Sequence, residues 1–239
     1  ERHAFVPWTL PALSEDERLA RGRALFEELD ARRSARFFSD APVSREAIEW
    51  AIRIASTAPS GAHRQPWTFV AVSEAATKRR IREAAEREER AFYEGGRAPD
   101  EWLDALQPIG TDWHKPYLET VPWLVVVFEQ VYGFDDRGER QRNYYTKESV
   151  GIACGMFVAA LHRMGLATLT HTPSPMGFLR DILGRPANER PYILFPIGRP
   201  ADDCVVPDLR RKSLDEVAIF DPPPMPDDTR SDPAPGAER

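Results

Sequence analysis

Residues 123–128 read WLVVVF, and this run of six apolar side chains limits the fold of the chain more tightly than any other segment. A strand with one face in water alternates apolar and polar residues, whereas this run offers nothing polar to solvent. The sequence therefore predicts a strand that is buried on both faces. Such a strand needs a sheet with helices packed on each side.

The flanking sequence supplies candidates for those helices and for neighbouring strands. Ser14 and Glu17 form a capping-box pattern ahead of one helix, Ser44 is placed to cap a second, and Gly165 ends a long, nearly all-apolar one. The predicted helices are 15–30, 45–56, 75–94, 145–164 and 178–183. The predicted strands are 67–73, 123–128, 167–170 and 192–198, with a polar loop over 132–142 and irregular structure over 199–220.

The composition excludes several classes of protein. With 239 residues, 42% of them apolar, the chain can form one large domain with a real core, so wholesale disorder is excluded. The net charge of −6 argues against nucleic acid as a partner. Two cysteines, Cys154 and Cys204, are too few for a disulfide scaffold and indicate a reducing compartment. No apolar run is long enough to cross a membrane, so we expect a cytoplasmic protein, with an anchor ahead of Glu1 left open.

We assign residues 1–220 to one domain. Residues 1–13 contain Pro and Trp without periodicity, which is typical of an arm that packs on another surface. Residues 221–239 are rich in Pro and Asp, and we predict a disordered tail.

Two basic clusters stand out in this acidic chain. Residues 32–36 read RRSAR, and residues 210–212 read RRK. Three guanidinium groups beside a hydroxyl can clamp a phosphate through bidentate hydrogen bonds. The alternative is a solvated helix end, where the helix dipole favours cations. The presence of two clusters shifts the balance toward an anionic ligand.

Residues 57–67, TAPSGAHRQPW, combine more small side chains than an ordinary connector needs. Ser60, Gly61 and Ala62 would let a flat ligand approach the backbone and its amide N–H groups. A plain turn that ends a helix is the alternative. Thr170 ends a predicted strand and Thr172 lies just beyond it. A hydroxyl there could donate to a ring nitrogen, and an ordinary strand end is the alternative.

Several common catalytic patterns are missing from the sequence. It contains no Gly-x-Gly-x-x-Gly after a strand, no Walker loop and no Gly-x-Ser-x-Gly elbow. The five histidines lack the spacing of metal ligands, so we predict no metal site.

Five motifs, RRSAR, TAPSGAHRQPWTF, THTP, LGRP and VPDLRRK, occur in this order within a likeness that spans about residues 7–217. In content and order they resemble the iodotyrosine deiodinase branch of the nitroreductase superfamily. The resemblance implies an α+β, nitroreductase-like fold, in which a mixed sheet is flanked by helices in a domain-swapped homodimer. Residues 1–13 and 199–220 would be the exchanged arms. Gly151 and Gly155 leave one side of the long helix small, which suits a subunit interface or a tight core contact.

The resemblance implies that the chain binds FMN. Thr172 matches the donor to the central nitrogen of the flavin ring, a contact that favours single-electron steps, and it is a predicted catalytic residue. This chain carries His171 where the family has Thr, so only a backbone contact is expected there. The matched cofactor residues are Arg32, Arg33, Ser34, Ala35, Arg36, Ser60, Thr170, His171, Thr172 and Arg211.

The resemblance also implies a lid, about residues 86–117, that recognises a free amino acid. Glu89 and Tyr93 are four residues apart and share one helix face, and Lys115 matches the third lid residue. A carboxylate for the ammonium, with a phenol and an ammonium for the carboxylate, fits a zwitterion. Surface charge on a polar helix is the alternative. Ala62 matches the residue whose backbone N–H meets the substrate phenolate, and it is the second predicted catalytic residue.

The implied reaction is FMN-dependent reductive dehalogenation of halotyrosines, from iodotyrosine to tyrosine and halide. NAD(P)H is the candidate ultimate electron donor, directly or through a separate flavin reductase. A general nitroreductase or another flavin oxidoreductase is the alternative. A non-enzymatic FMN-binding protein ranks lower, because it would not need the Glu–Tyr–Lys lid.

Overall fold

The structure is a computed structural model that describes residues 4–221. Residues 1–3 of the predicted N-terminal arm, and all of the predicted tail after Asp221, lie outside the described residues. The chain divides into two compact units, one that ends at Pro207 and one that begins at Asp208.

The order of helices and strands follows the predicted one closely. The helices are α1 Glu15–Asp30, α2 Arg45–Ala55, α3 Ala75–Tyr93, α4 Asp100–Leu106, α5 Tyr117–Thr120, α6 Thr146–Arg163, α7 Gly177–Ile182 and α8 Leu214–Val217, with short 3₁₀ helices η1 at Gly61–His63 and η2 at Gln107–Ile109. The strands are β1 Trp67–Val72, β2 Trp123–Gln130, β3 Tyr132–Phe134, β4 Arg140–Arg142, β5 Ala167–Thr168 and β6 Glu189–Gly198.

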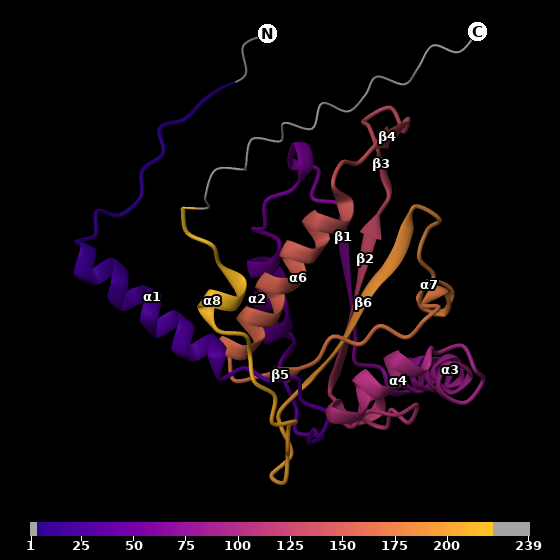
Figure 1. The fold of residues 1–239 in the computed structure, drawn as a ribbon. Helices are drawn as coiled ribbons and strands as arrows, with labels where there is room; N and C mark the ends of the chain where they lie inside the picture. The colour runs from indigo at the N-terminus through magenta and orange to yellow at the C-terminus, as the bar shows by residue number, and fades with distance from the viewer. Residues whose placement is uncertain (1–3, 222–239) are drawn as a thin grey trace, which may run out of the picture. The chain divides into compact units, whose positions relative to one another are not determined.

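A four-stranded sheet in the order β1-β2-β6-β5 forms the centre of the first unit, with β2 and β6 in the middle (Figure 1). Each neighbouring pair of these strands is antiparallel. An isolated bridge between Ser34 and Thr168 pairs in parallel and joins the segment after α1 to the β5 edge. The bridge lies outside the named strands, so the four-stranded sheet itself is antiparallel rather than mixed.

Strand β2 is buried on both faces, as its sequence predicts. Val125 and Val127 pack with α2 and α6 on one side. Leu124, Val126 and Phe128 belong to the core on the other side, with side chains of α3, α5 and α7. Successive side chains of a strand point to opposite faces, so a run without polar residues fills two cores at once.

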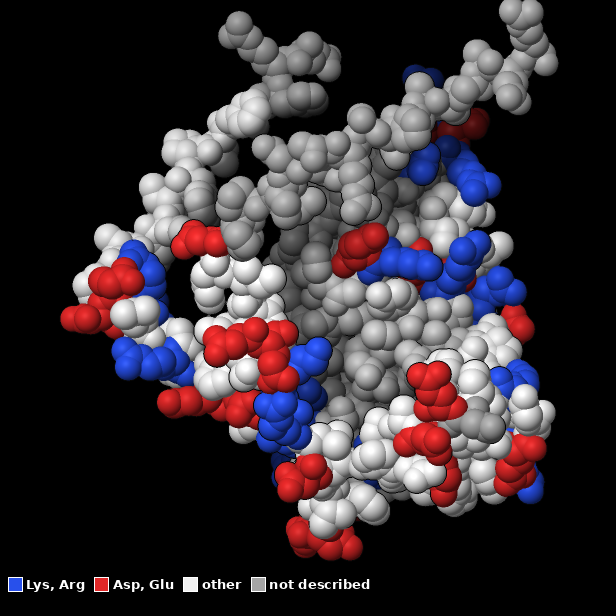
Figure 2. Space-filling view, in the orientation of Figure 1, with Lys and Arg blue, Asp and Glu red and all other residues white. Residues whose placement is uncertain are grey.

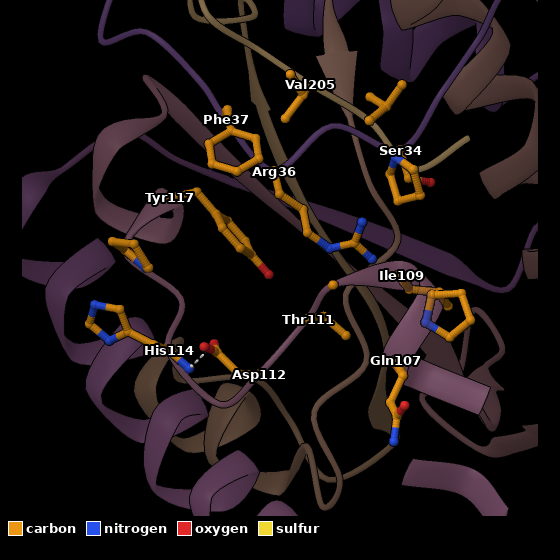
Figure 3. A pocket seen from close by; sticks show the side chains of 15 residues that line it. Ser34, Arg36, Phe37, Gln107, Ile109, Thr111, Asp112, His114, Tyr117 and Val205 are labelled. Atoms are coloured by element: carbon orange, nitrogen blue, oxygen red, sulfur yellow. Dashed lines mark hydrogen bonds between the residues drawn. The ribbon is translucent and has the colours of Figure 1, made fainter. Parts of the chain in front are cut away.

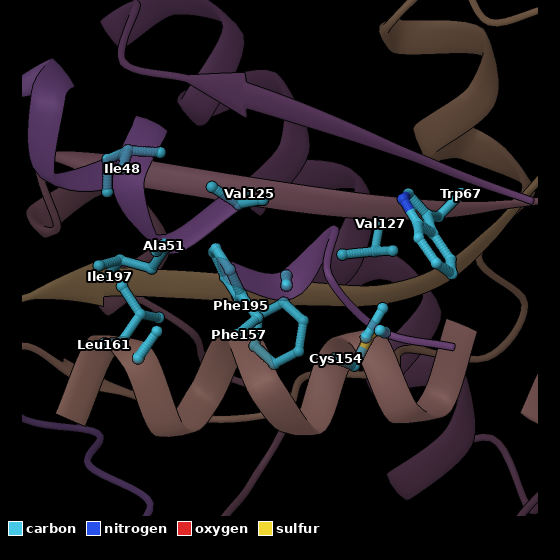
Figure 4. Packing of buried hydrophobic residues seen from close by; sticks show 14 of the residues in the cluster. Ile48, Ala51, Trp67, Val125, Val127, Cys154, Phe157, Leu161, Phe195 and Ile197 are labelled. Carbon is cyan, nitrogen blue, oxygen red and sulfur yellow. The ribbon is translucent and has the colours of Figure 1, made fainter. Parts of the chain in front are cut away.

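Helix α6 covers the first of these faces (Figure 4). The ring of Phe157 packs against Phe69 of β1 and Phe195 of β6, with centroid separations of 5.4 Å in both pairs. The opposite side of α6 is open, because Ile152 and Gly155 are exposed. Among residues 4–221, neither α6 nor any other helix is long and apolar enough to cross a membrane.

The helix ends confirm the sequence signals. Ser14 and Glu17 form the reciprocal capping box of α1, and the Ser44 side chain accepts a bond from the Ala47 amide at the start of α2. Gly165, just past α6, has a φ of 72°, a left-handed conformation that glycine adopts without steric cost.

Two segments predicted to be irregular contain regular structure. Residues 132–142 are not a loop but the hairpin β3–β4, in which the Arg140 guanidinium lies 3.8 Å from the ring centroid of Tyr132. The strands have three residues each, YGF and RQR, which is too short for a period of two to be recognised in the sequence. In the second unit, Ser213 and Glu216 form a capping box that starts the single-turn helix α8.

Replacing Phe157 with alanine should lower the free energy of unfolding by about 3–5 kcal/mol, because the cavity would lie between α6 and the sheet. Urea denaturation measures this loss. The matched control is Phe134→Ala in the β3–β4 hairpin, where the ring is 60% exposed and a change below about 1 kcal/mol is expected. Equal losses in the two variants would contradict the assigned core.

Candidate functional site

A cavity of about 530 Å³ opens between the segment after α1, the lid (residues 86–117) and residues 205–207 (Figure 3). Arg36 and the hydroxyl of Tyr117 point into it from neighbouring walls. Its lining residues are Ser34, Arg36, Phe37, Gln107, Pro108, Ile109, Gly110, Thr111, Asp112, His114, Pro116, Tyr117, Val205, Val206 and Pro207.

The RRSAR segment is extended where it lines the cavity, so its side chains alternate. Ala35 is buried in the core, and its amide donates to the Thr168 carbonyl at 3.3 Å. Ser34 and Arg36 face the cavity instead. The Nε atom of Arg36 is buried and has no hydrogen-bond partner among the described residues. A buried donor without a partner is uncommon, and here it points to a ligand acceptor.

Arg33 fits the alternative reading of the same cluster. Its guanidinium is exposed and donates to the carbonyls of Asp30, the last residue of α1, and of Arg32, the latter at 3.0 Å. The RRSAR motif therefore contains both a helix-end residue and a candidate ligand-binding residue. Arg33 completes a helix end, whereas Arg36 presents a donor to the cavity.

The lid brings Glu89, Tyr93 and Lys115 together. Glu89 and Tyr93 lie on one face of α3, and Lys115 comes from the loop before α5. Lys115 Nζ lies 3.4 Å from Glu89 Oε2 and 5.8 Å from the centroid of the Tyr93 ring. The Glu89 and Lys115 side chains are only 13% and 3% exposed. The structure brings together the three residues that the resemblance grouped, and Glu89 and Lys115 are not solvated surface charges; their role in binding substrate stays a prediction.

The two charges of this pair are held in a poorly solvated place. Burial raises the pKa of Glu89, and Lys115 opposes that shift. Burial lowers the pKa of Lys115, and Glu89 opposes it. Lys115 Nζ also donates to Thr111 Oγ1 at 2.9 Å and to the Asp112 carbonyl. Removing one partner of such a pair costs about 3–5 kcal/mol, because the other charge stays buried.

The ring of His171 is directed toward the lid, and the predicted backbone contact of this residue with the flavin stays a prediction. Its backbone exchanges hydrogen bonds with Leu194, and its ring is buried against the lid. Nδ1 lies 3.4 Å from the Tyr117 hydroxyl, and Nε2 lies 4.0 Å from Glu89 Oε1. Burial, reinforced by the nearby Lys115 and Arg36, lowers the pKa of His171 to about 3. The ring is therefore neutral at physiological pH.

Thr170 and Thr172 flank this buried histidine and are both exposed. In extended backbone, residues on either side of a buried one face the opposite way. The two hydroxyls thus lie on the side of the segment away from Glu89. Their flavin contacts stay predictions.

The loop after α2 has an unusual backbone. Ala62, His63 and Gln65 have φ values of 50°, 53° and 48°, a left-handed conformation that costs free energy for residues other than glycine. A Cβ at Gly61 would lie 2.5 Å from the Tyr144 carbonyl oxygen, so only glycine fits there. The Ser60 hydroxyl accepts from the Gln65 amide at 2.9 Å. Strain of this kind is found at functional sites.

The structure does not bring this loop to the RRSAR cluster. The Gly61 amide donates to Ser149 Oγ near the start of α6, whereas Ser34 bridges Thr168, beyond the end of α6 at Arg163. At 1.5 Å per residue, the helix between Ser149 and Arg163 separates the two segments by about 20 Å. Ser60 and Ala62 therefore cannot reach the same small ligand as Arg36 within one protomer.

The remaining predicted cofactor residue, Arg211, belongs to the second unit. It is exposed, and its neighbour Arg210 pairs with Glu216 at 3.1 Å. Its cofactor role stays a prediction.

The sequence did not identify Tyr117, Thr111 and Asp112 as parts of the site. Tyr117 contacts His171, while Thr111 and Asp112 hold Lys115. The only signal was their closeness to Lys115 in the sequence.

The surface charges are mixed. Lys and Arg alternate with Asp and Glu over α1 and over the α3–α4 region on the face shown in Figure 2. Within the described residues, no group of three His, Cys, Asp or Glu side chains could hold a metal ion.

Comparisons with known proteins agree with this geometry. The nitroreductase family model matches residues 29–199. An iodotyrosine deiodinase from Haliscomenobacter hydrossis is 51% identical over 92% of this chain and 98% of its own length. The human iodotyrosine deiodinase 1 is 43% identical over 92% of this chain and 76% of its own length.

Solved structures of an iodotyrosine deiodinase and of another flavoprotein are also similar to this chain. An iodotyrosine deiodinase crystallised with FMN and 3-iodo-L-tyrosine is similar with a TM-score of 0.69 and 29% identity, covering 82% of this chain and all of that one. A BluB-like flavoprotein from Clostridium difficile has a TM-score of 0.63 at 20% identity over 82% of this chain and 98% of its own, which shows a shared fold.

The buried His171 should make stability depend on pH. Its pKa is lower in the folded state than in the unfolded state, so the unfolded chain binds the extra proton between about pH 6.5 and 3. Stability from this group is complete above about pH 6.5 and is lost on acidification, by about 1.4 kcal/mol per pH unit at most. Urea denaturation at pH 7 and pH 5 measures the loss.

His171→Gln should reduce that pH dependence. The matched control, His162→Gln, removes a histidine of α6 outside this cluster. A smaller pH dependence in both variants, or in neither, would contradict the assignment to His171.

Proposed function

Because the chain belongs to the nitroreductase family, and within it to the iodotyrosine deiodinases, we propose that it removes halogen from halotyrosines by FMN-dependent reduction. The enzyme is an FMN-dependent oxidoreductase, and its products are tyrosine and halide. The convergence of Glu89, Tyr93 and Lys115 beside the cavity is the observation that carries the choice of a free amino acid as substrate.

The residues around the cavity fit FMN. Arg36 offers a buried Nε without a partner among the described residues, and Ser34 adds a hydroxyl on the same wall. We assign these two, with Arg32, to the phosphate and ribityl groups, and Arg33 would have to leave the carbonyls of Asp30 and Arg32 to join them. Reduced FMN supplies two electrons, which with one proton replace the carbon–halogen bond by a carbon–hydrogen bond and release halide.

The lid recognises both charged groups of the amino acid. Glu89 accepts from the substrate ammonium, while Lys115 and Tyr93 donate to the substrate carboxylate. Burial raises the pKa of Tyr93, with a further contribution from Glu89, so the phenol keeps its proton and remains a donor. In the structure Glu89 and Lys115 pair with each other. A zwitterion that enters between them gives each buried charge a new partner, which avoids the cost of leaving it unpaired.

The ring of the substrate is held by the backbone at Ala62 and lies beside Thr172 in this proposal. An ortho halogen acidifies the phenol, so the ligand binds as phenolate, and a fixed amide N–H stabilises that charge strongly where water is excluded. The left-handed backbone at Ala62, with Gly61 fixed against Tyr144, supports a loop that is shaped in advance for this contact. Thr172 is exposed and free of the core, as a residue that donates to the flavin ring must be.

A complete site requires two protomers. The loop that carries Ser60 and Ala62 lies about 20 Å from the cavity along α6, so we propose that each site combines the RRSAR cluster of one protomer with this loop from its partner. The exposed side of α6, with Ile152 and Gly155, supports a homodimer interface. Exchange of residues 1–13 and 199–220 would extend it.

Each turnover consumes two electrons from outside the protein. We propose NAD(P)H as their ultimate source, either directly or through a separate flavin reductase.

Glu89→Gln should weaken the binding of 3-iodotyrosine by about 10-fold or more, because the amide oxygen can still accept from the ammonium but no longer carries the negative charge that strengthens the bond. Binding of 2-iodophenol, which has no amino group, should change far less. Quenching of flavin fluorescence measures both. Glu88→Gln, one residue away and paired with Arg97, is the control. An equal loss for both ligands would contradict the zwitterion role.

Subunit complementation tests the shared site. Arg36→Glu and Gly61→Val should each abolish dehalogenation in a homodimer. Co-expressed in equal amounts, they should recover about a quarter of wild-type activity, since half of the dimers are mixed and one of the two sites in each is intact. No recovery, with mixed dimers shown by two affinity tags, would place both segments in one protomer's site.

A further inference from the structure

The ring of His171 is the buried group that the proposed function leaves without a role. It is 5% exposed, and its Nε2 atom has no hydrogen-bond partner among the described residues. A buried polar atom without a partner in a native protein calls for an explanation. The nearest acceptor that the structure records for it is Oε1 of Glu89, at 4.0 Å.

The ring cannot easily turn to another partner. Hydrogen bonds of 2.9 and 3.0 Å between the backbones of His171 and Leu194 fix the segment. The Tyr117 ring packs edge-on against the imidazole, with centroids 6.1 Å apart, and the Tyr117 hydroxyl lies 3.4 Å from Nδ1. Burial raises the pKa of Tyr117 well above its usual range, so its hydroxyl stays protonated and can either donate or accept. In the arrangement in which it donates to Nδ1, the imidazole proton lies on Nε2, toward Glu89.

The two oxygens of Glu89 face different partners. Oε2 is directed to Lys115 Nζ at 3.4 Å, and Oε1 is directed to His171 Nε2. A shift of about 1 Å by the carboxylate would bring Oε1 within hydrogen-bond distance of Nε2. Such a shift is available once Lys115 turns from Glu89 to a substrate carboxylate.

We infer that His171 is a positioning residue for amino-acid recognition, which donates from Nε2–H to Glu89 and fixes that carboxylate for the substrate ammonium. The inference rests on the proposed function, in which Glu89 binds the ammonium. An imidazolium at this position would neutralise Glu89 and compete with the substrate. A neutral imidazole orients the carboxylate and leaves its charge available.

The length of the side chain at position 171 decides whether it can contact Glu89 on α3. A threonine at this position would be too short for this contact, because its hydroxyl is attached directly to Cβ. His171 therefore links residues 170–172, which are predicted to contact the flavin, to Glu89 of the lid. Its effect should appear in the preference for amino acids over simple phenols.

The test compares variants that keep or lose the donor near the position of Nε2. The FMN-loaded, full-length protein is titrated with 3-iodotyrosine and with 2-iodophenol, and the ratio of the two Kd values is the readout. His171→Asn, whose amide does not reach Glu89, should reduce the preference for iodotyrosine about tenfold. His171→Gln, whose amide does reach, should stay close to wild type. Equal ratios in the two variants would overturn the inference.

A double-mutant cycle separates positioning from a general loss of structure. If His171 acts through Glu89, then His171→Asn should have no further effect on the ratio in a Glu89→Gln background. Additive effects would overturn the inference. A wild-type protein that binds the two ligands equally would instead refute the zwitterion role of the lid, and the inference about His171 with it.

A measurement on the wild-type protein covers the case in which the Asn variant does not fold. Nitrogen-15 NMR of the histidine side chains reports which ring nitrogen carries the proton. We expect Nε2–H at His171, with a signal that shifts on adding 3-iodotyrosine and not on adding 2-iodophenol. A proton on Nδ1, or the same shift with both ligands, would overturn the inference.

Discussion

Burial of β2 on both faces is the constraint on which the larger unit depends. Its alternate side chains enter two separate cores, so helices must cover the sheet twice. Helix α3 packs on one of these faces through Ile81 and Ala85, and the turns that follow carry Glu89 and Tyr93 past the core. The packing that stabilises the sheet therefore also sets where the lid begins.

The lid holds a buried ion pair, Glu89 and Lys115, and this pair accounts for its proposed preference for a zwitterion. Glu89 and Lys115 are nearly excluded from water, where isolated charges are costly. They tolerate this place because each has the other, with Thr111 and Asp112 as further partners for Lys115. A zwitterion offers the same two charges, so it can enter without leaving either side chain unpaired. A neutral phenol offers neither.

Two features of the fold carry strain or incomplete bonding and lie where function is proposed. One is the loop with Gly61 and Ala62, where left-handed residues other than glycine are held in place by contacts with Tyr144 and Ser149. The other is the pair of buried nitrogens, Arg36 Nε and His171 Nε2, that have no partner among the described residues. A fold optimised only for stability has no reason to keep such groups.

The sequence by itself determined the strands and helices with strong periodicity or caps, such as the two-sided strand at 123–128 and the helix after Ser14, because these signals are local. It also placed Glu89 and Tyr93 on one helix face, and motif order indicated the family. It could not reveal the β3–β4 hairpin, whose strands have only three residues each, or the direction of the His171 ring. Only the tertiary structure decided that the His171 ring faces Glu89, and that the segments carrying Ser60 and Arg36 lie near opposite ends of α6. Contacts between distant segments depend on packing that no local pattern encodes.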